Sequence, residues 1–73
     1  MKVTLDRSAN AAYISLTSSS QDEPYHMYPC DPIEVGGQIN LDFDTLGRLV
    51  GIEIMDAKRL LPEDLLNNAE IIG

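Results

Sequence analysis

The sequence contains little of what usually stabilises a small domain. Its 73 residues include one cysteine, Cys30, so no disulfide can form within the chain. A domain of this size buries only about 60% of the surface that its unfolded chain exposes. Small scaffolds therefore usually depend on disulfides, a bound metal or oligomerisation. Because an internal disulfide is excluded, we expect a homo-oligomer, with a symmetric dimer as the preferred state.

Long apolar segments are also absent. No apolar run approaches the roughly 20 residues that a membrane-spanning helix requires. The first residues, Met1–Asp6, have no apolar segment typical of a secretory signal peptide. A lone cysteine is typical of a reducing compartment. We therefore expect a cytoplasmic protein with no membrane partner.

Basic residues are scarce. Five Lys and Arg stand against 12 Asp and Glu, which gives a net charge of −7. The basic residues form no run longer than two: Lys2, Arg7, Arg48, Lys58 and Arg59. Because clustered Lys and Arg bind phosphate backbones, we expect no nucleic-acid partner. An acidic surface keeps a protein soluble and also favours a basic protein partner, and the charge alone does not choose between these two interpretations.

The sequence does contain alternating apolar and polar residues, which are typical of β-strands with one buried face. Residues 39–43 and 50–54 alternate on either side of the loop 45–48, in which Gly47 can adopt a positive φ. We predict a β-hairpin here. The register that gathers the apolar side chains on one face has three pairs, namely Phe43 with Val50, Leu41 with Ile52, and Ile39 with Ile54.

Two further segments complete the predicted sheet. Residues 1–5 and 11–17 alternate around the turn-forming segment 6–10, which predicts a first hairpin. Residues 25–28 lie among prolines, which confine such a segment to the edge of a sheet or exclude it from one.

Residues after Asp56 follow a helical period. Leu61, Leu65, Leu66 and Ala69 share the spacing of one helix face. Pro62 suits the first helical position, and the acidic residues that follow it suit the positive end of the helix dipole. So short a helix is marginal alone in water, and we expect it to dock on the apolar face of the sheet.

These patterns predict one α+β domain over residues 1–73, with a small antiparallel sheet of three to five strands, two hairpins and a short C-terminal α-helix packed on one face. The predicted core consists of the apolar residues that share the inner face: Val3, Leu5, Ile14, Leu16, Ile39, Leu41, Phe43, Val50, Ile52, Ile54, Leu61, Leu65 and Leu66.

Two stretches carry a more specific pattern. One is Met1–Val3 followed by Asp6 and Asn10–Leu16, and the other, long and ungapped, is Leu41–Ala57. Together they resemble a family of short prokaryotic proteins catalogued as domain of unknown function 2283. The sequence departs from the family pattern at Asn10, where an acid is more usual, and in its longer, proline-rich middle. The resemblance implies a sheet-plus-helix domain with no established activity. Some family members are suspected antitoxins of two-gene toxin–antitoxin modules.

A partial calcium-loop motif overlaps the second hairpin. Asp42, Asp44, Gly47 and Glu53 match positions one, three, six and twelve of the motif. Position five is Leu46, which cannot bind a cation, and the flanking residues alternate as strands where the motif needs helices. We therefore treat Asp42, Asp44 and Glu53 as a weak acidic cluster on a solvated sheet face and expect no calcium site.

A second group of residues has the side chains, but not the spacing, of a zinc site. His26, Cys30, Asp31 and Glu34 lack the paired spacing of structural zinc sites. We expect an exposed histidine and a part-buried cysteine, with a metal shared between subunits as the alternative. Nucleophilic catalysis needs an activating base and an orienting group, and the sequence shows neither beside Cys30. We therefore predict no enzyme activity, no catalytic residue and no cofactor.

Four apolar residues lie outside the predicted core face: Tyr13, Leu46, Leu49 and Met55. Clustered on a surface, they would form a contact patch. The predicted function is a non-catalytic protein-interaction module, with a second copy or a basic protein as its partner. The alternative is a small-ligand or metal-binding module formed across a homodimer.

Overall fold

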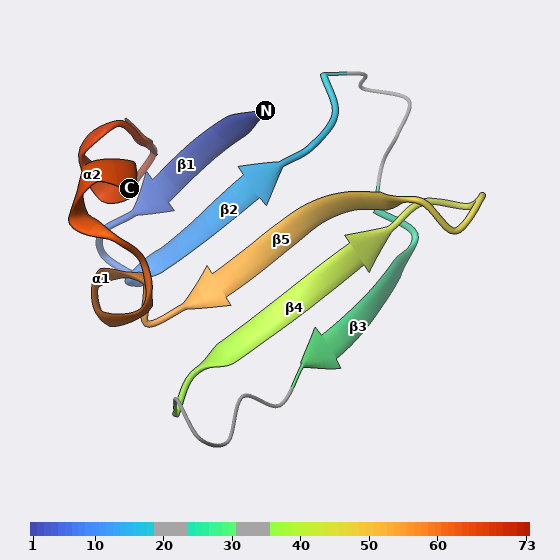
Figure 1. Cartoon of the computed structure of the whole chain (residues 1–73), viewed down its shortest axis with the longest axis horizontal. Helices are drawn as coiled ribbons and strands as arrows, with labels where there is room; N and C mark the ends of the chain where they lie inside the picture. Colours follow the sequence, from blue (N-terminus) through green and yellow to red (C-terminus); the bar gives the residue numbers. More distant parts are fainter. Residues whose placement is uncertain (19–23, 31–35) are drawn as a thin grey trace.

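The computed structural model describes residues 1–18, 24–30 and 36–73. In chain order its elements are β1 (Lys2–Asp6), β2 (Ala11–Ser15), β3 (His26–Cys30), β4 (Gln38–Phe43), β5 (Leu49–Met55), α1 (Ala57–Leu60), α2 (Glu63–Asn67) and β6 (Glu70–Ile71). The six strands form one sheet in the order β3-β4-β5-β2-β1-β6 (Figure 1). Neighbouring strands are antiparallel except β1 and β6, which are parallel. The α+β class is confirmed, but the sheet is mixed rather than antiparallel, exceeds five strands, and is accompanied by two short helices rather than one.

The first hairpin forms as predicted. Leu5 lies opposite Ala12 in the β1–β2 pair. The turn is stabilised by the Asp6 carboxylate, which accepts hydrogen bonds from the backbone N–H groups of Ser8 and Ala9 at 3.0 and 3.2 Å. This is the local turn chemistry that favours Asp and Ser at such positions.

The second hairpin follows the predicted register at two pairs and departs from it at the third. Leu41 lies opposite Ile52 and Ile39 opposite Ile54, as predicted, but Phe43 lies opposite Leu49 instead of Val50. A β-bulge next to Phe43 inserts one extra residue into β5 and shifts the pairing by one position. The alternation of residue types does not reveal such an insertion. Gly47 has φ +77°, as its place in the turn requires.

The helical region contains one more helix than was predicted: the predicted helix, with Pro62 in its first position, corresponds to α2, and α1 precedes it. Leu61 is extended, with φ −105° and ψ 146°, and it separates α1 from α2. The residue before a proline is disfavoured in the helical conformation, so Pro62 ends α1. Pro62 itself lies immediately before α2 instead of in its first turn. Neither helix, nor any other in the described ranges, is long and apolar enough to cross a membrane.

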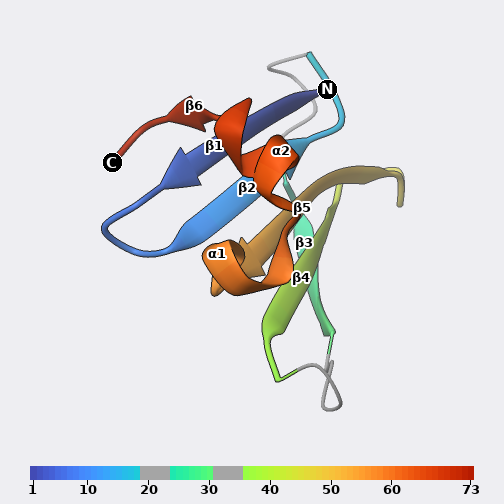
Figure 2. The same cartoon turned by 60° about the vertical axis from the view of Figure 1, so that its left-hand side comes forward.

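The core lies at one end of the sheet. We call the end where β5 leads into α1 the helix end, and the end that carries the β4–β5 turn the turn end; Figures 1 and 2 show both helices gathered at the former. Leu5, Ala12 and Ala57 are buried together at the helix end, and Leu61, Leu66 and Ala69 pack against them. Elsewhere in the described chain the buried apolar residues are Val50 and Ile54.

This distribution corrects the predicted core. Leu5, Val50 and Ile54 are buried as predicted, and Leu16 is exposed. The remaining predicted core residues are half-buried, because the helices cover too little of the sheet to enclose them: Val3, Ile14, Ile39, Leu41, Phe43, Ile52, Leu61, Leu65 and Leu66. The two buried alanines carry too little apolar surface for the pattern to have identified them.

Candidate functional site

Exposed apolar side chains gather at the turn end of the sheet and along its β3 edge. We call six of them the turn-end surface: Leu16, Tyr25, Met27, Tyr28, Leu46 and Leu49. Tyr25 and Leu46 are the most exposed, each at 74%. Exposed apolar side chains that gather in one region of a small protein mark contact sites more often than isolated ones do.

Backbone contacts connect the parts of the turn-end surface. The N–H of Tyr25 donates to the carbonyl of Phe43 at 2.8 Å, and Phe43 lies opposite Leu49. The N–H of Leu16 donates to the carbonyl of Val50 at 2.9 Å. Residues from β2, β3 and β5 therefore meet at one end of the sheet, together with the turn that carries Leu46.

The β3 edge presents apolar side chains on both faces of the sheet. Met27 lies opposite Asp42 and Tyr28 opposite Leu41, and successive residues of a strand point to opposite faces. β3 is an edge strand, which is one of the two alternatives that its prolines allowed, and Pro29 within it has no N–H to offer a further strand. A partner that covers Met27 and Tyr28 together must contact the edge itself.

A polar cluster occupies the face of the sheet opposite the helices. The ring of Tyr13, on β2, crosses over Gly51, and its hydroxyl donates to Oδ2 of Asp42 on β4 at 2.8 Å. A Cβ atom at residue 51 would overlap the tyrosine ring and hydroxyl, so only glycine leaves this path open. Desolvation raises the pKa of Tyr13 to about 12, and the hydrogen bond to Asp42 and the nearby Glu53 act in the same direction.

Asn40 forms the second part of this cluster. It is buried, and its amide donates to Oε1 of Glu53 at 2.8 Å, while its own Oδ1 has no hydrogen-bond partner among the described residues. Glu53 lies opposite both Asn40 and Tyr13 in the sheet. These side-chain contacts join β2, β4 and β5 on the polar face of the sheet. The carboxylates of Asp42 and Glu53 both accept hydrogen bonds from side chains of the protein.

Asp44, the third member of the predicted acidic cluster, lies in the β4–β5 turn. Its carboxylate accepts hydrogen bonds from the backbone N–H groups of Leu46 and Arg48, each at 2.9 Å, and from Nε of Arg48 at 2.8 Å. The backbone N–H of Arg48 is the main reason why the pKa of Asp44 is lowered, and the Arg48 guanidinium adds to the effect. Asp44 thus shapes the turn. Within residues 1–18, 24–30 and 36–73, no group of three or more His, Cys, Asp and Glu side chains is placed to hold a metal ion.

Two residues of the predicted zinc-type group, His26 and Cys30, lie at the two ends of β3. His26 is exposed and Cys30 is half-buried, and the four strand steps between them correspond to about 13 Å. Asp31 and Glu34 lie outside the described residues. The pair on β3 is therefore too widely spaced to share one ion.

The four predicted interface residues fall into two pairs. Tyr13 and Met55 are half-buried diagonal neighbours on β2 and β5, since Tyr13 pairs with Glu53 and Met55 with Ala11. Leu46 and Leu49 are exposed and belong to the turn-end surface. The interface itself stays a prediction. Its four residues do not lie together: one pair is on the polar face of the sheet and the other is at the turn end.

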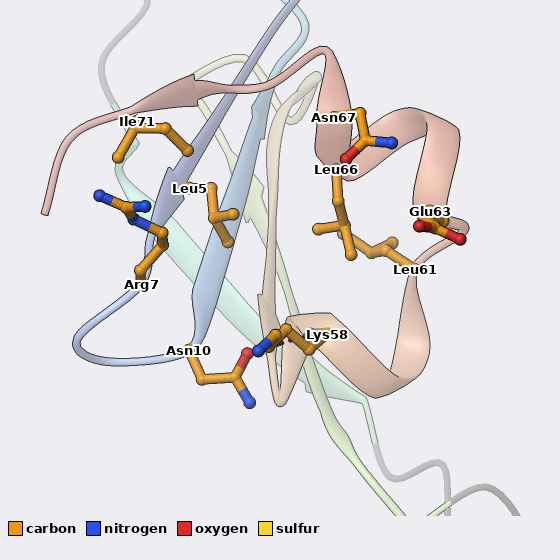
Figure 3. Close-up of a pocket in the computed structure, with 9 residues that line it drawn as sticks. All are labelled: Leu5, Arg7, Asn10, Lys58, Leu61, Glu63, Leu66, Asn67 and Ile71. Atoms are coloured by element: carbon orange, nitrogen blue, oxygen red, sulfur yellow. Dashed lines mark hydrogen bonds between the residues drawn. The ribbon is translucent and has the colours of Figure 1, made fainter.

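A hollow that the sequence patterns did not indicate lies at the helix end. It has a volume of about 570 Å³ and opens between β1, β6 and the two helices (Figure 3). Its lining combines apolar and polar side chains: Leu5, Arg7, Asn10, Lys58, Leu61, Glu63, Leu66, Asn67 and Ile71. These residues come from segments far apart in the chain, and no local spacing could have grouped them.

Comparisons with known proteins identify a family and nothing more specific. A family model described as protein of unknown function (DUF2283) matches residues 2–58, which span β1 to β5 and the start of α1. No curated protein and no solved structure matches the chain.

Proposed function

We propose that this chain, which belongs to the DUF2283 family of proteins of unknown function, is a non-catalytic protein-interaction module that binds through its turn-end surface. The observation that carries the proposal is the exposure of six large apolar side chains at one end and edge of the sheet, where no described helix covers them. Exposed sheet edges and apolar patches are the features by which protein surfaces pair.

The partner that we propose is a second copy of the chain. An edge strand such as β3 can pair with its symmetry mate about a two-fold axis, which is the commonest symmetry of homo-oligomers. Pairing would bury Tyr25, Met27 and Tyr28 from both copies. It would thereby supply the apolar burial that a chain of 73 residues lacks by itself. Because Pro29 has no N–H, we expect backbone pairing to be limited to residues 25–28.

A basic protein is the second candidate partner, supported by the net charge of −7. Electrostatic attraction of this kind accelerates association and is weakened by salt. The turn-end surface would then be the apolar centre of a heterologous contact.

Sedimentation velocity of the whole chain at micromolar concentration tests the proposal. We expect a species of twice the 8.1 kDa chain mass. The variants Tyr28→Asp and Leu49→Asp should each shift the population to monomer, because a buried, unpaired carboxylate is costly at an interface. The matched control is Ile72→Asp, which places the same charge on an exposed apolar residue at the C-terminal segment.

Two results would contradict the dimer. One is a monomer at every concentration for the unmodified chain, and the other is an equal loss of dimer in Ile72→Asp. Circular dichroism of each variant shows whether the sheet is retained, so that dissociation can be separated from unfolding.

A further inference from the structure

The basic side chains of the chain divide into two groups. Three form ion pairs with carboxylates: Lys2 with Glu70 at 2.9 Å, Arg48 with Asp44 at 2.8 Å, and Arg59 with Asp56 at 2.6 Å. Within the described residues, the side chains of Arg7 and Lys58 form neither an ion pair nor a hydrogen bond. Both of these unpaired cations line the hollow at the helix end (Figure 3).

The two segments that carry these cations are joined by backbone and amide contacts. Asn10, at the end of the β1–β2 turn that carries Arg7, accepts a hydrogen bond from the backbone N–H of Lys58 through Oδ1 at 3.0 Å. Its Nδ2 donates to Oδ1 of Asp56 at 3.1 Å, and its carbonyl accepts from the N–H of Ala57 at 3.0 Å. Asn10 therefore fixes the turn against the start of α1. An aspartate at this position could not donate to Asp56.

The floor of the hollow is apolar. Leu5 is buried beneath it, and Leu61, Leu66 and Ile71 complete the apolar lining. Figure 3 shows Leu5 and Leu66 directed toward each other between β1 and α2, with Arg7 beside Ile71 and Lys58 beside Asn10. A ligand in this space would contact hydrocarbon along its length and a cation at its end.

The rim carries an excess of positive charge. Arg7 and Lys58 stand against a single carboxylate, Glu63, in a chain whose net charge is −7. We therefore expect an anion to bind here more readily than elsewhere on this acidic protein. Small-molecule sites are typically apolar hollows of this size with a few convergent polar groups.

We infer that the hollow binds a small amphipathic carboxylate, whose charged group contacts Arg7 and Lys58 and whose apolar chain lies over Leu5, Leu66 and Ile71. The site lies at the helix end, away from the turn-end surface. The ligand-binding inference can therefore be correct or wrong independently of the proposed dimer. It also lies partly beyond residue 58, outside the segment that the family model matches.

A titration followed by methyl NMR tests the inference. Octanoate, kept below its micelle concentration, should cause saturable shifts of the Leu5, Leu66 and Ile71 methyl signals. Octan-1-ol lacks the charge and acetate lacks the chain, so each should bind more weakly by at least about threefold. The double variant Arg7→Gln/Lys58→Gln should weaken octanoate binding by about threefold to tenfold, because exposed ion pairs contribute modestly. The control Lys2→Gln removes a cation outside the hollow and should leave binding unchanged.

Three results would overturn the inference: shifts that do not saturate, octanol binding as tightly as octanoate, or an equal effect of Lys2→Gln and the double variant. Both rim residues are exposed, and their side chains form no hydrogen bond or ion pair within the described residues, so the double variant should retain the native amide spectrum. A double variant with a native spectrum and undiminished octanoate affinity would also overturn it.

Discussion

The two ends of the sheet differ in how far their apolar face is covered. At the helix end, Leu5, Ala12 and Ala57 are buried beneath α1 and α2. At the turn end, Val50 is buried while Leu16 and Leu49 remain exposed. The same strands run through both ends, so the difference arises from what packs on them and not from the strands themselves.

Element lengths explain the difference. The helices have four and five residues, which corresponds to about 6 to 8 Å of helix each. β5 has seven residues, or about 23 Å of strand. Two such helices cover one end of the sheet and cannot reach the other. A domain of this size that builds a wide sheet therefore leaves part of its apolar face exposed.

The largest expected effect belongs to the centre of the helix end. Leu5→Ala should lower the free energy of unfolding by about 2 to 5 kcal/mol, because it leaves a cavity against Ala12 and Ala57. Leu16→Ala at the turn end should change it by no more than about 0.5 kcal/mol in the monomer. Urea denaturation of both variants, at concentrations below dimer formation, provides the measurement. Equal losses would show that the two ends are not packed differently.

A smaller effect is expected where the polar face joins the strands. Gly51→Ala should destabilise the fold by about 1 to 3 kcal/mol, because the new methyl group overlaps the Tyr13 ring. Adding Tyr13→Ala removes the overlap, so the double variant should be more stable than the sum of the single losses implies. Strictly additive losses in the double-mutant cycle would mean that Tyr13 does not cross Gly51.

The smallest effect concerns the β4–β5 turn and depends on pH. The pKa of Asp44 is lower in the folded chain than its ordinary value of 3.8, so the ionised form stabilises the fold above about pH 4. This stabilisation is lost as the pH falls through the folded pKa. Asp44→Asn should therefore be less stable than the parent at pH 7, and the difference should shrink as the pH falls below about 4. Thermal unfolding of the parent and of Asp44→Asn at several pH values provides the measurement. If the difference in stability between them does not change with pH, the ionisation of Asp44 does not contribute to the stability of the fold.

The sequence predicted those features that depend on local periodicity. The alternation of apolar residues placed Ile39 opposite Ile54 and Leu41 opposite Ile52. The prolines excluded the interior of the sheet for residues 25–28 but did not decide whether these residues form an edge strand. The sequence did not predict the bulge near Phe43. A bulge changes which residues pair, and the alternation of residue types within each strand does not show such a change. The helix predicted to start at Pro62 corresponds to α2, which begins one residue later, whereas the separate short helix α1 before Leu61 was not predicted.

Features that depend on distant segments were not predictable in this way. The Tyr13–Asp42 hydrogen bond requires β2 and β4 to lie on either side of β5, which no local pattern states. The hollow combines the β1–β2 turn with both helices and β6. The candidate interface residues were chosen because they lie outside the main apolar face. That criterion placed Leu46 and Leu49 on the surface. It could not add Tyr25, Met27 and Tyr28 to the candidate interface, because the prolines left open whether their segment forms a strand.

The parallel pairing of β6 with β1 has a consequence for synthesis on the ribosome. It joins Thr4 to Glu70 and Leu5 to Ile71, and the N–H of Ile72 donates to the carbonyl of Leu5 at 3.0 Å. Contacts so far apart in sequence form late, since loop closure must precede them. While translation proceeds, one side of β1 stays open until residues 70–72 have left the exit tunnel. The nascent chain therefore exposes a second unpaired edge that the finished fold closes, and during that interval it is most open to pairing with the wrong strand.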